Sequence, residues 1–303
     1  MKIVDLFCGA GGMSLGFSRA GFEVVHAFDN WQHAVDTSAA NMDHPVSLLD
    51  LADVAATESS LTPLFDVNEQ VRPGLIGGPP CQDFSSAGKR VEADRADLTE
   101  KFSGYVRVMQ PSFVVMENVA RAQHAGVYQR ALNTMRASGY AVDAIVINAA
   151  LVGVPQARKR LFAIGTRDEL DTAAVMDRLR AGLAETPMTM RDYFGDSLGI
   201  EHYYRHPRSY ARRGVFSIDE PSPTVRGVNR PIPPGYRPHP GDSAPIEQAR
   251  PLTTAERAQV QTFPSDYEFC GPATAREQMI GNAVPPRLAE YVAAVVTGVL
   301  DGA

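Results

Sequence analysis

The chain has 303 residues, of which 44% are hydrophobic and 21% charged, and its net charge is −6. This composition is typical of a globular protein with a real apolar core, and it excludes collagen-like, disordered and disulfide-scaffold classes. Three cysteines are too few for a disulfide framework and favour a reducing cytoplasm. The most apolar stretch, 141–154, is short and carries Asp143 and Asn148, so we expect no membrane span. Glycines begin too early, at Gly9, for a signal peptide.

The positive charge is unevenly distributed along the chain. Arginine accounts for 25 of the 29 basic residues, and residues 202–250 carry a net charge of +4 while the remainder carries −10. A local basic region on an acidic protein favours binding of a polyanion at one place, although a solvated arginine-rich loop region is the alternative on charge alone. Its arginines are Arg205, Arg208, Arg212, Arg213, Arg226, Arg230, Arg237 and Arg250.

The first 165 residues alternate between strand-like and helix-like patterns. We expect strands at 2–7, 23–28, 73–78 and 112–118, with helices between them, and two further strands at 140–148 and 160–165 that pair as a hairpin. Such alternation predicts βαβ units, and therefore an α/β fold with a mostly parallel sheet covered by helices on both faces.

The pattern becomes irregular after residue 170. Prolines cluster between 221 and 245, and no long amphipathic helix is visible across 203–248, which predicts a smaller loop-rich domain. After Pro286 an apolar helix face returns, and we expect this last helix to pack on the first domain. The expected division is residues 1–170 plus 273–303 for one domain and 171–272 for the other.

A glycine-rich turn, Gly9 to Gly12, follows the first strand. Glycines allow close backbone approach, and the helix that begins here offers N–H groups to a ligand. Asp29 ends the second strand, where a carboxylate can bind a ribose diol, and a third strand-like piece ends at Asp50. These features predict a nucleoside-bearing cofactor, and they leave both NAD and a purely structural turn open.

Two further strand ends carry reactive groups. Cys81 follows a buried strand and two prolines, and precedes a polar loop containing Gly88, which suits a thiolate nucleophile beneath a closing lid. A buried inert thiol is the alternative, and it is the preferred interpretation for Cys8 and Cys270. Glu117 ends another buried strand, where a carboxyl can hold a proton; a helix-capping role is its alternative.

An arginine pair, Arg158 and Arg160, lies in the segment before the last predicted strand. At i and i+2 of an extended segment the two share a face and can grip an oxygen-rich ligand, while Lys159 points away. The Cys and His spacings of a metal site do not occur in the sequence, so we expect no metal.

Six motifs in order resemble the DNA (cytosine-5) methyltransferase family, of the prokaryotic restriction-modification type. They are DLFCGAGG, GGPPCQDFS, ENV, QARKR, RPLTTAERAQVQTFP and QMIGNAVPP, and they cover nearly the whole chain except about 171–248. The resemblance implies a Rossmann-like fold that uses S-adenosylmethionine and releases S-adenosylhomocysteine, with a target-recognition domain in the arginine-rich region.

The resemblance also implies roles for individual residues. Cys81 bonds C6 of a flipped-out cytosine, Glu117 acts at N3, and Arg158 or Arg160 neutralises O2. The cofactor contacts it implies are Phe7, Gly9, Gly11, Gly12, Asp29, Asn30, Asp50, Leu51, Pro79, Leu98, Asn282 and Ala283. Asn30 stands where the family usually has an aromatic residue. The implied DNA contacts are Gln82, Ser85, Arg205, Arg208, Arg212, Arg213, Arg226 and Arg230.

Two other functions remain as alternatives. The same chemistry on tRNA is one, although the Cys-Phe-Thr segment of that branch is absent from the variable region. A NAD-dependent Rossmann oxidoreductase is the other, but it leaves Cys81, Glu117 and the arginine pair unexplained. With the methyltransferase we expect duplex DNA as partner, no membrane, a cytoplasmic location and a monomer. A chain of this length also suggests a bacterial or phage enzyme with a cognate restriction endonuclease.

Overall fold

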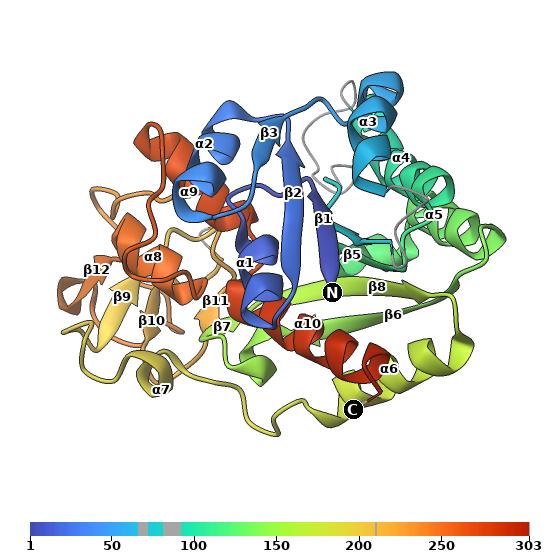
Figure 1. Cartoon of the computed structure of the whole chain (residues 1–303). Coiled ribbons are helices and arrows are strands. Elements are labelled where there is room, and N and C mark those ends of the chain that lie inside the picture. Colours follow the sequence, from blue (N-terminus) through green and yellow to red (C-terminus); the bar gives the residue numbers. More distant parts are fainter. Residues whose placement is uncertain (66–71, 81–91, 210, 303) are drawn as a thin grey trace.

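The computed structural model describes residues 1–65, 72–80, 92–209 and 211–302. Its centre is a seven-stranded sheet in the order β3-β2-β1-β4-β5-β8-β6 (Figure 1). The strands are β1 Lys2–Leu6, β2 Glu23–Asp29, β3 Val46–Leu48, β4 Gly74–Gly77, β5 Phe113–Val119, β6 Ala141–Asn148 and β8 Lys159–Thr166. Only β8 runs antiparallel to its neighbours, β5 and β6. The predicted α/β fold and the predicted pairing of the last two strands are confirmed.

Helices cover both faces of this sheet. One face carries α1 Gly12–Arg19, α6 Glu169–Ala181 and α10 Pro286–Leu300, and the other carries α3 Val54–Leu61, α4 Glu92–Met109 and α5 Gly126–Ala137. Helix α2, Gln32–Asn41, packs beside β2 and β3. Short 3-10 turns lie at Thr62–Phe65, Ala120–His124, Ala149–Val152 and Ile246–Gln248.

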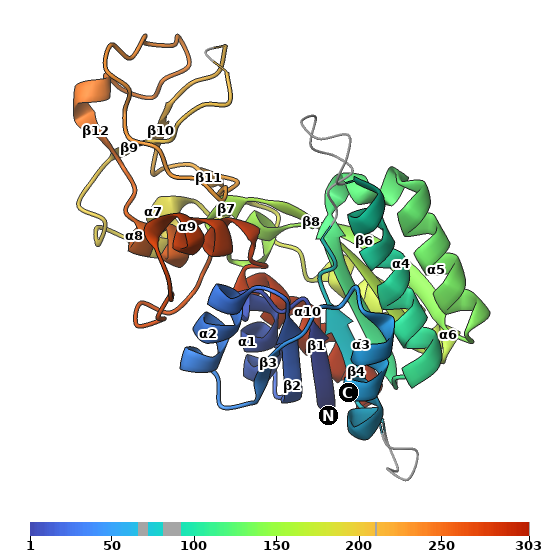
Figure 2. The same ribbon diagram turned by 90° about the horizontal axis from the view of Figure 1, so that it is seen from above.

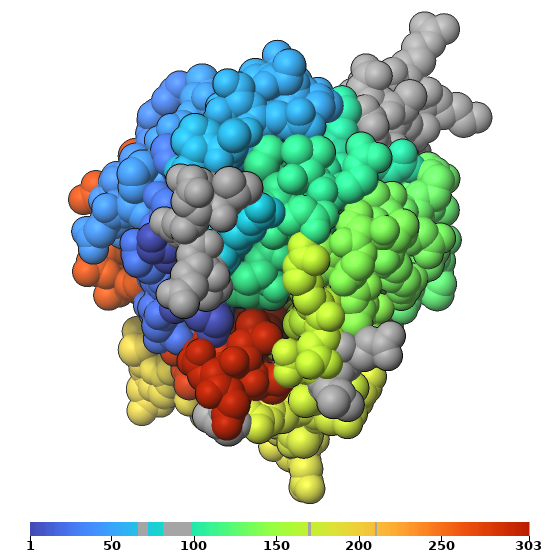
Figure 3. Space-filling model, turned by 45° about the vertical axis from the view of Figure 1, so that its right-hand side comes forward, coloured from blue at the N-terminus to red at the C-terminus, as the bar shows by residue number. Residues whose placement is uncertain are grey.

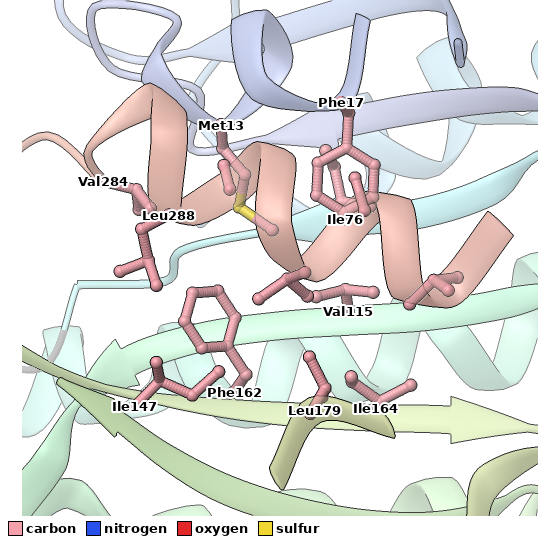
Figure 4. Close-up of a cluster of buried hydrophobic side chains, with 14 of the residues drawn as sticks. Met13, Phe17, Ile76, Val115, Ile147, Phe162, Ile164, Leu179, Val284 and Leu288 are labelled. Carbon is pink, nitrogen blue, oxygen red and sulfur yellow. The ribbon is translucent and has the colours of Figure 1, made fainter. Parts of the chain in front are cut away.

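Side-chain alternation along the strands divides the core in two. Ile3 of β1 packs in the cluster under α1 and α10, whereas Val4 and Leu6 pack in the cluster under α3 to α5. Figure 4 shows the first cluster, in which Phe17 of α1 and Leu288 of α10 meet side chains of the sheet. The two clusters make the central strands continuous apolar runs, as parallel strands covered on both faces must be.

The last helix packs on the large domain, as predicted from its apolar face, and its main partner there is α1. In α1 the backbone at Gly16 lies so close to α10 that an added Cβ would be 2.5 Å from the Ala289 Cβ and from the Pro286 carbonyl oxygen. The end of α10, in red in Figure 3, reaches the surface beside the yellow-green residues of α6. Residues 273–300 are long and apolar enough to cross a membrane by composition, but half of their most apolar 18-residue window is buried in the protein. Because α10 buries its apolar face against α1 and α6, we interpret it as a core helix.

The remainder of the chain forms a smaller, loop-rich part. It contains a three-stranded sheet in the order β10-β9-β12 and a two-stranded sheet of β11 and β7. The strands are β7 Gln156–Ala157, β9 His202–Tyr204, β10 Val215–Ser217, β11 Ser222–Pro223 and β12 Ala249–Pro251, and the helices are α7 Met190–Phe194, α8 Thr254–Val260 and α9 Ala273–Asn282. In Figure 2 the three-stranded sheet stands away from the large sheet, with α8 and α9 between them.

The packing shifts both expected domain boundaries. Helix α6 packs on β6, β8 and α10, so the expected boundary at residue 171 falls inside a helix of the large domain. Helix α9, which we expected in the large domain, contributes Met279 and Ile280 to the same buried cluster as Tyr203 and Phe216 of the smaller sheet. The same cluster also contains Ala10 and Ala34 of the large domain, so helix α9 forms the joint between the two parts.

The close contact at Gly16 gives a stability prediction. Gly16→Ala should lower the free energy of unfolding by about 1–3 kcal/mol, because the new methyl group collides with the backbone of α10. Gly104→Ala in α4 is the matched control: no described atom lies within 4 Å of its added Cβ. That control should raise stability by roughly 0.5–1 kcal/mol through helix propensity. Urea unfolding followed by circular dichroism measures both; equal effects would contradict the packing argument.

Candidate active site and nucleic-acid interface

The register of the large sheet brings the predicted site segments to one edge. Leu6 pairs with both Phe28 and Gly77, and Gly77 pairs with Met116, so the ends of β1, β2, β4 and β5 are aligned. Because β8 is antiparallel, its beginning lies at the same edge, where Arg160 pairs with Val119. Ligands of open parallel sheets bind at this carboxyl edge.

The glycine turn has a backbone that few other residues tolerate. Phe7, Gly9 and Gly11 have φ angles of 61°, 54° and 78°, and in a non-glycine residue such as Phe7 this left-handed conformation stores strain. At Gly12 an added Cβ would lie 2.3 Å from the Val284 carbonyl oxygen. Tyr267 also donates a hydrogen bond of 2.6 Å to the Ala10 carbonyl. Tyr267 and Val284 thus pack against the glycine turn and fix its position.

Asp29 is fixed against this turn. Its carboxylate accepts hydrogen bonds from the backbone N–H of Gly9 at 2.8 Å and of Trp31 at 2.9 Å, one to each oxygen. Burial raises the pKa of the Asp29 carboxyl, and these hydrogen bonds oppose the shift. Each oxygen keeps a lone pair for a further donor, as a ribose diol requires. Asn30 beside it is exposed.

Asp5 is a candidate ligand-binding residue that the sequence analysis missed. It is fully buried, and Ser14 donates a hydrogen bond of 2.6 Å to one carboxylate oxygen, while the other has no hydrogen-bond partner among the described residues. Burial raises the pKa of Asp5 to about 7. A buried oxygen with no partner, next to the glycine turn, suits a ligand with a donor group. The available signal was an acidic residue inside an otherwise apolar strand.

Glu117 and Arg160 form an ion pair at the same edge. The Arg160 Nε lies 2.8 Å from the Glu117 Oε1, and both side chains are nearly buried. Burial raises the pKa of Glu117, although Arg160 and Arg158 oppose the shift. This environment favours the protonated carboxyl more than water does around an exposed glutamate.

Arg158 does not share this position, and the expectation that both arginines grip a ligand is wrong for it. Its side chain is fully buried, and its guanidinium donates hydrogen bonds to the carbonyl oxygens of Val225, Gly281, Asn282 and Ala283, at 3.2, 3.0, 3.3 and 2.9 Å. These bonds join the large domain to the loop-rich part. Arg158 is therefore a structural joint, and Arg160 is the arginine presented beside Glu117.

The segment that leads to Cys81 runs directly past Glu117. An added Cβ on Gly78 would lie 3.0 Å from the Glu117 Oε2, and the Asn118 side chain donates a hydrogen bond of 3.2 Å to the Pro79 carbonyl. Cys81, Gln82 and Ser85 lie outside the described residues.

The other predicted cofactor residues lie around the turn or beside α4. Asp50 is exposed and accepts a hydrogen bond of 3.0 Å from the Ala52 N–H, and Asn282 is exposed at the end of α9, followed by Ala283. Leu51 and Leu98 are buried, and Tyr105 of α4 donates to the Leu51 carbonyl at 2.8 Å. No ligand contact tests these positions, so they remain predictions.

The predicted DNA-contacting arginines divide into two groups. Arg208, Arg212 and Arg230 are exposed. Arg205 donates a hydrogen bond of 2.7 Å to the Thr224 carbonyl, and Arg226 donates one to the His206 carbonyl. Arg213 forms an ion pair with Glu220 and stacks over Phe216. The second group therefore shapes the loop-rich part as well as adding to its charge.

Comparison with known proteins identifies the family. The C-5 cytosine-specific DNA methylase family matches residues 1–297. The chain is 50% identical over 302 residues to the Type II methyltransferase M.HgiDI of Herpetosiphon aurantiacus, covering 99% of this chain and 96% of that protein. It is 47% identical over 300 residues to the Type II methyltransferase M.HindV of Haemophilus influenzae, covering 98% and 96%.

Solved structures show the same fold. A putative DNA modification methyltransferase encoded within an E. coli prophage superposes with a TM-score of 0.70 at 23% identity, covering 99% of both chains. The S. pombe Dnmt2 methyltransferase gives 0.69 at 14% identity, covering 99% of both chains. With the family match along almost the whole sequence, these findings show that the chain belongs to the C-5 cytosine-specific DNA methylase family and is a DNA (cytosine-5) methyltransferase.

Proposed function

We propose that this enzyme transfers a methyl group from S-adenosylmethionine to C5 of a cytosine flipped out of a short, specific duplex DNA sequence. The reaction proceeds through a covalent bond between Cys81 and C6, and S-adenosylhomocysteine is the product. The observation that carries the proposal is the Glu117–Arg160 ion pair, which lies against Gly78, three residues before Cys81.

The reaction explains why these residue types are needed together. C5 of cytosine is a weak nucleophile, and addition of a thiolate at C6 breaks the aromatic ring and gives C5 enamine character. Electron density then accumulates at N3 and O2 of the base. Glu117, with its raised pKa, can donate a proton or hydrogen bond at N3, and Arg160 beside it neutralises O2. Loss of the C5 proton and release of the Cys81 thiolate complete the reaction.

The glycine turn and its neighbours fit the proposed cofactor. S-adenosylmethionine supplies an electrophilic methyl group when bound. The Asp29 oxygens, each held by one backbone N–H, suit the two hydroxyls of a ribose, and the unpartnered Asp5 oxygen suits a donor on the ligand. The remaining proposed contacts are Phe7, Gly9, Gly11, Gly12, Asn30, Asp50, Leu51, Pro79, Leu98, Asn282 and Ala283.

The loop-rich part is the proposed target-recognition domain. An enzyme cannot reach C5 and C6 inside a stacked duplex, so the base has to be rotated out of the helix. Exposed Arg208, Arg212 and Arg230 can contact phosphates and guanine edges. The Type II relatives support a role in restriction-modification, with a cognate endonuclease, a monomeric enzyme and a cytoplasmic location as further parts of the proposal.

The first test is direct mapping of the product. Purified enzyme incubated with methyl-labelled S-adenosylmethionine and unmethylated duplex DNA should place label at one short recurring sequence, read by bisulfite sequencing. Transfer RNA is the parallel substrate. Label on tRNA with none on DNA would overturn the substrate, and an absence of cofactor binding would overturn the whole proposal.

The covalent step gives a second prediction. A duplex with 5-fluorocytosine at the mapped position should trap an enzyme–DNA adduct that survives denaturing electrophoresis. The reason is that a base can remove the proton at C5 but cannot remove a fluorine there, so Cys81 is not released. Cys81→Ser should abolish both turnover and the adduct while leaving cofactor binding unchanged. An active enzyme that forms no adduct would contradict the mechanism.

The two arginines should respond differently to the same substitution. Arg160→Met should lower kcat by about 10²–10³-fold with little change in cofactor affinity, since it removes charge stabilisation at the base. Arg158→Met should lower the free energy of unfolding by about 3 kcal/mol or more, because several buried carbonyls lose their donor. Urea unfolding and single-turnover kinetics separate the two effects. If the Arg158→Met enzyme had normal stability but no turnover, Arg158 would have to act in catalysis, and its structural role would be contradicted.

A further inference from the structure

The segment after β11, residues 224–229, follows a path set mainly by side chains from elsewhere in the protein. The Val225 N–H donates to the Gln156 Oε1 at 2.8 Å, and the Val225 carbonyl accepts from Arg158 at 3.2 Å. The Thr224 carbonyl accepts from Arg205 at 2.7 Å. Side chains from β7, from the residue between β7 and β8, and from just after β9 therefore fix the beginning of the 224–229 segment.

The middle of this segment is held by Arg257 of α8. One Arg257 nitrogen, Nη2, donates to the Arg226 carbonyl and also to the Val228 carbonyl, the latter at 3.3 Å. The two carbonyls flank Gly227, the residue that adds most to the conformational freedom of the segment. The Arg257 guanidinium therefore restrains the backbone on both sides of Gly227, where it would otherwise be most flexible.

Arg257 is itself held by a buried partner. Its other terminal nitrogen forms an ion pair with Glu277 of α9, and the two residues are only 6% and 7% exposed. The Glu277 Oε1 also accepts a hydrogen bond of 2.6 Å from Thr254. Burial lowers the pKa of Arg257 to about 10, with Arg226 adding to the shift, so the group stays charged at neutral pH. The planar guanidinium fork can serve the carboxylate and both carbonyls at once, which a lysine ammonium cannot do in the same geometry.

Backbone contact closes the other side of the segment. An added Cβ on Gly281 of α9 would lie 2.1 Å from the Gly227 nitrogen and 2.2 Å from the Arg226 carbonyl carbon. The segment is therefore confined between α8 and the end of α9. Its outer side chains are nevertheless open to solvent: Val228 is 54% exposed, and Asn229 and the following Arg230 are exposed as well.

A clamped backbone that presents exposed side chains is what discrimination between similar ligands requires. If the segment could adjust, it would adapt to a wrong base pair and lose little binding energy; if it is fixed, the mismatch is left with unpaired groups. Ordering the segment in advance also removes the entropy cost of ordering it on DNA.

We propose that the buried Arg257–Glu277 pair is a specificity-determining positioning device, which fixes the backbone of residues 226–228 so that Val228, Asn229 and Arg230 meet duplex DNA in one geometry. The hydrogen bonds and ion pair of Arg257 are made within the loop-rich part and α9, so the pair acts through the 224–229 segment and not on the reacting atoms. This inference rests on the proposed reading of DNA by the loop-rich part.

The test compares Arg257→Lys with the wild-type enzyme on two kinds of duplex. One carries the target sequence mapped for the wild type, and the other carries single base-pair changes in it. The ratio of kcat/KM between target and altered duplex should fall about tenfold in Arg257→Lys, the size of effect that one base-pair contact has. KM for the target duplex should rise, while kcat at saturating DNA and the Kd for S-adenosylhomocysteine stay within about twofold of wild type.

The matched control is Arg250→Lys. Arg250 also makes an ion pair with a residue of α8, Glu256, at 2.6 Å, but it is partly exposed and makes no hydrogen bond to the 224–229 segment among the described contacts. Its discrimination ratio should equal that of wild type. An unchanged ratio in Arg257→Lys, or an equal fall in Arg250→Lys, overturns the inference.

A second variant covers the case in which Arg257→Lys does not fold. Glu277→Gln keeps an acceptor for Thr254 but removes the charge that holds Arg257, so a smaller fall in the ratio is expected, and an unchanged ratio overturns the inference. Failure of the proposed function has a different signature, since wild-type enzyme would then methylate no duplex sequence at all.

Discussion

One buried cation holds the two parts of this protein together. The Arg158 guanidinium has no exposed surface and is surrounded by carbonyl oxygens from Val225 on one side and from residues 281–283 on the other. A buried positive charge is costly without hydrogen-bond acceptors, and these carbonyls serve its two terminal nitrogens, although its Nε has no partner among the described residues. The junction of β7 and β8, the 224–229 segment and the end of α9 therefore cannot separate independently of one another. The relative placement of the glycine turn, Glu117 and the loop-rich part depends on this joint.

A second constraint is the one strand of the described seven-stranded sheet that runs antiparallel to its neighbours, β8. In a wholly parallel sheet, a residue at the start of a strand would lie at the edge opposite to the carboxyl ends of its neighbours. Because β8 runs the other way, Arg160 at its start meets Glu117 near the end of β5. The reversal of β8 thus places the cationic Arg160 beside the buried carboxyl of Glu117. Burial raises the pKa of Glu117, and Arg160 limits that rise.

Features set by neighbouring residues were predictable from the sequence, and features set by distant ones were not. The strands, the glycine turn and Asp29 follow from local pattern, because a buried strand and a turn have short-range signatures. The different roles of Arg158 and Arg160 do not, since an extended QARKR segment gives both arginines the same face, and the partners of Arg158 lie 67 to 125 positions away. Asp5 was missed because it lies in an otherwise apolar strand. Arg257 was missed because it lies in the segment RPLTTAERAQVQTFP, which was used only to recognise the family and not residue by residue.

The contact between the first and last helices has a consequence for synthesis of the enzyme. The glycine turn is translated long before the residues that back it, because Val284 lies against Gly12, and α10 lies against α1. The site proposed for the methyl donor is therefore completed only when Val284 and α10 have been translated and have docked. A nascent chain that still lacks this helix lacks the residues that pack behind the glycine turn, so on the proposed function methylation has to wait until α10 has been made.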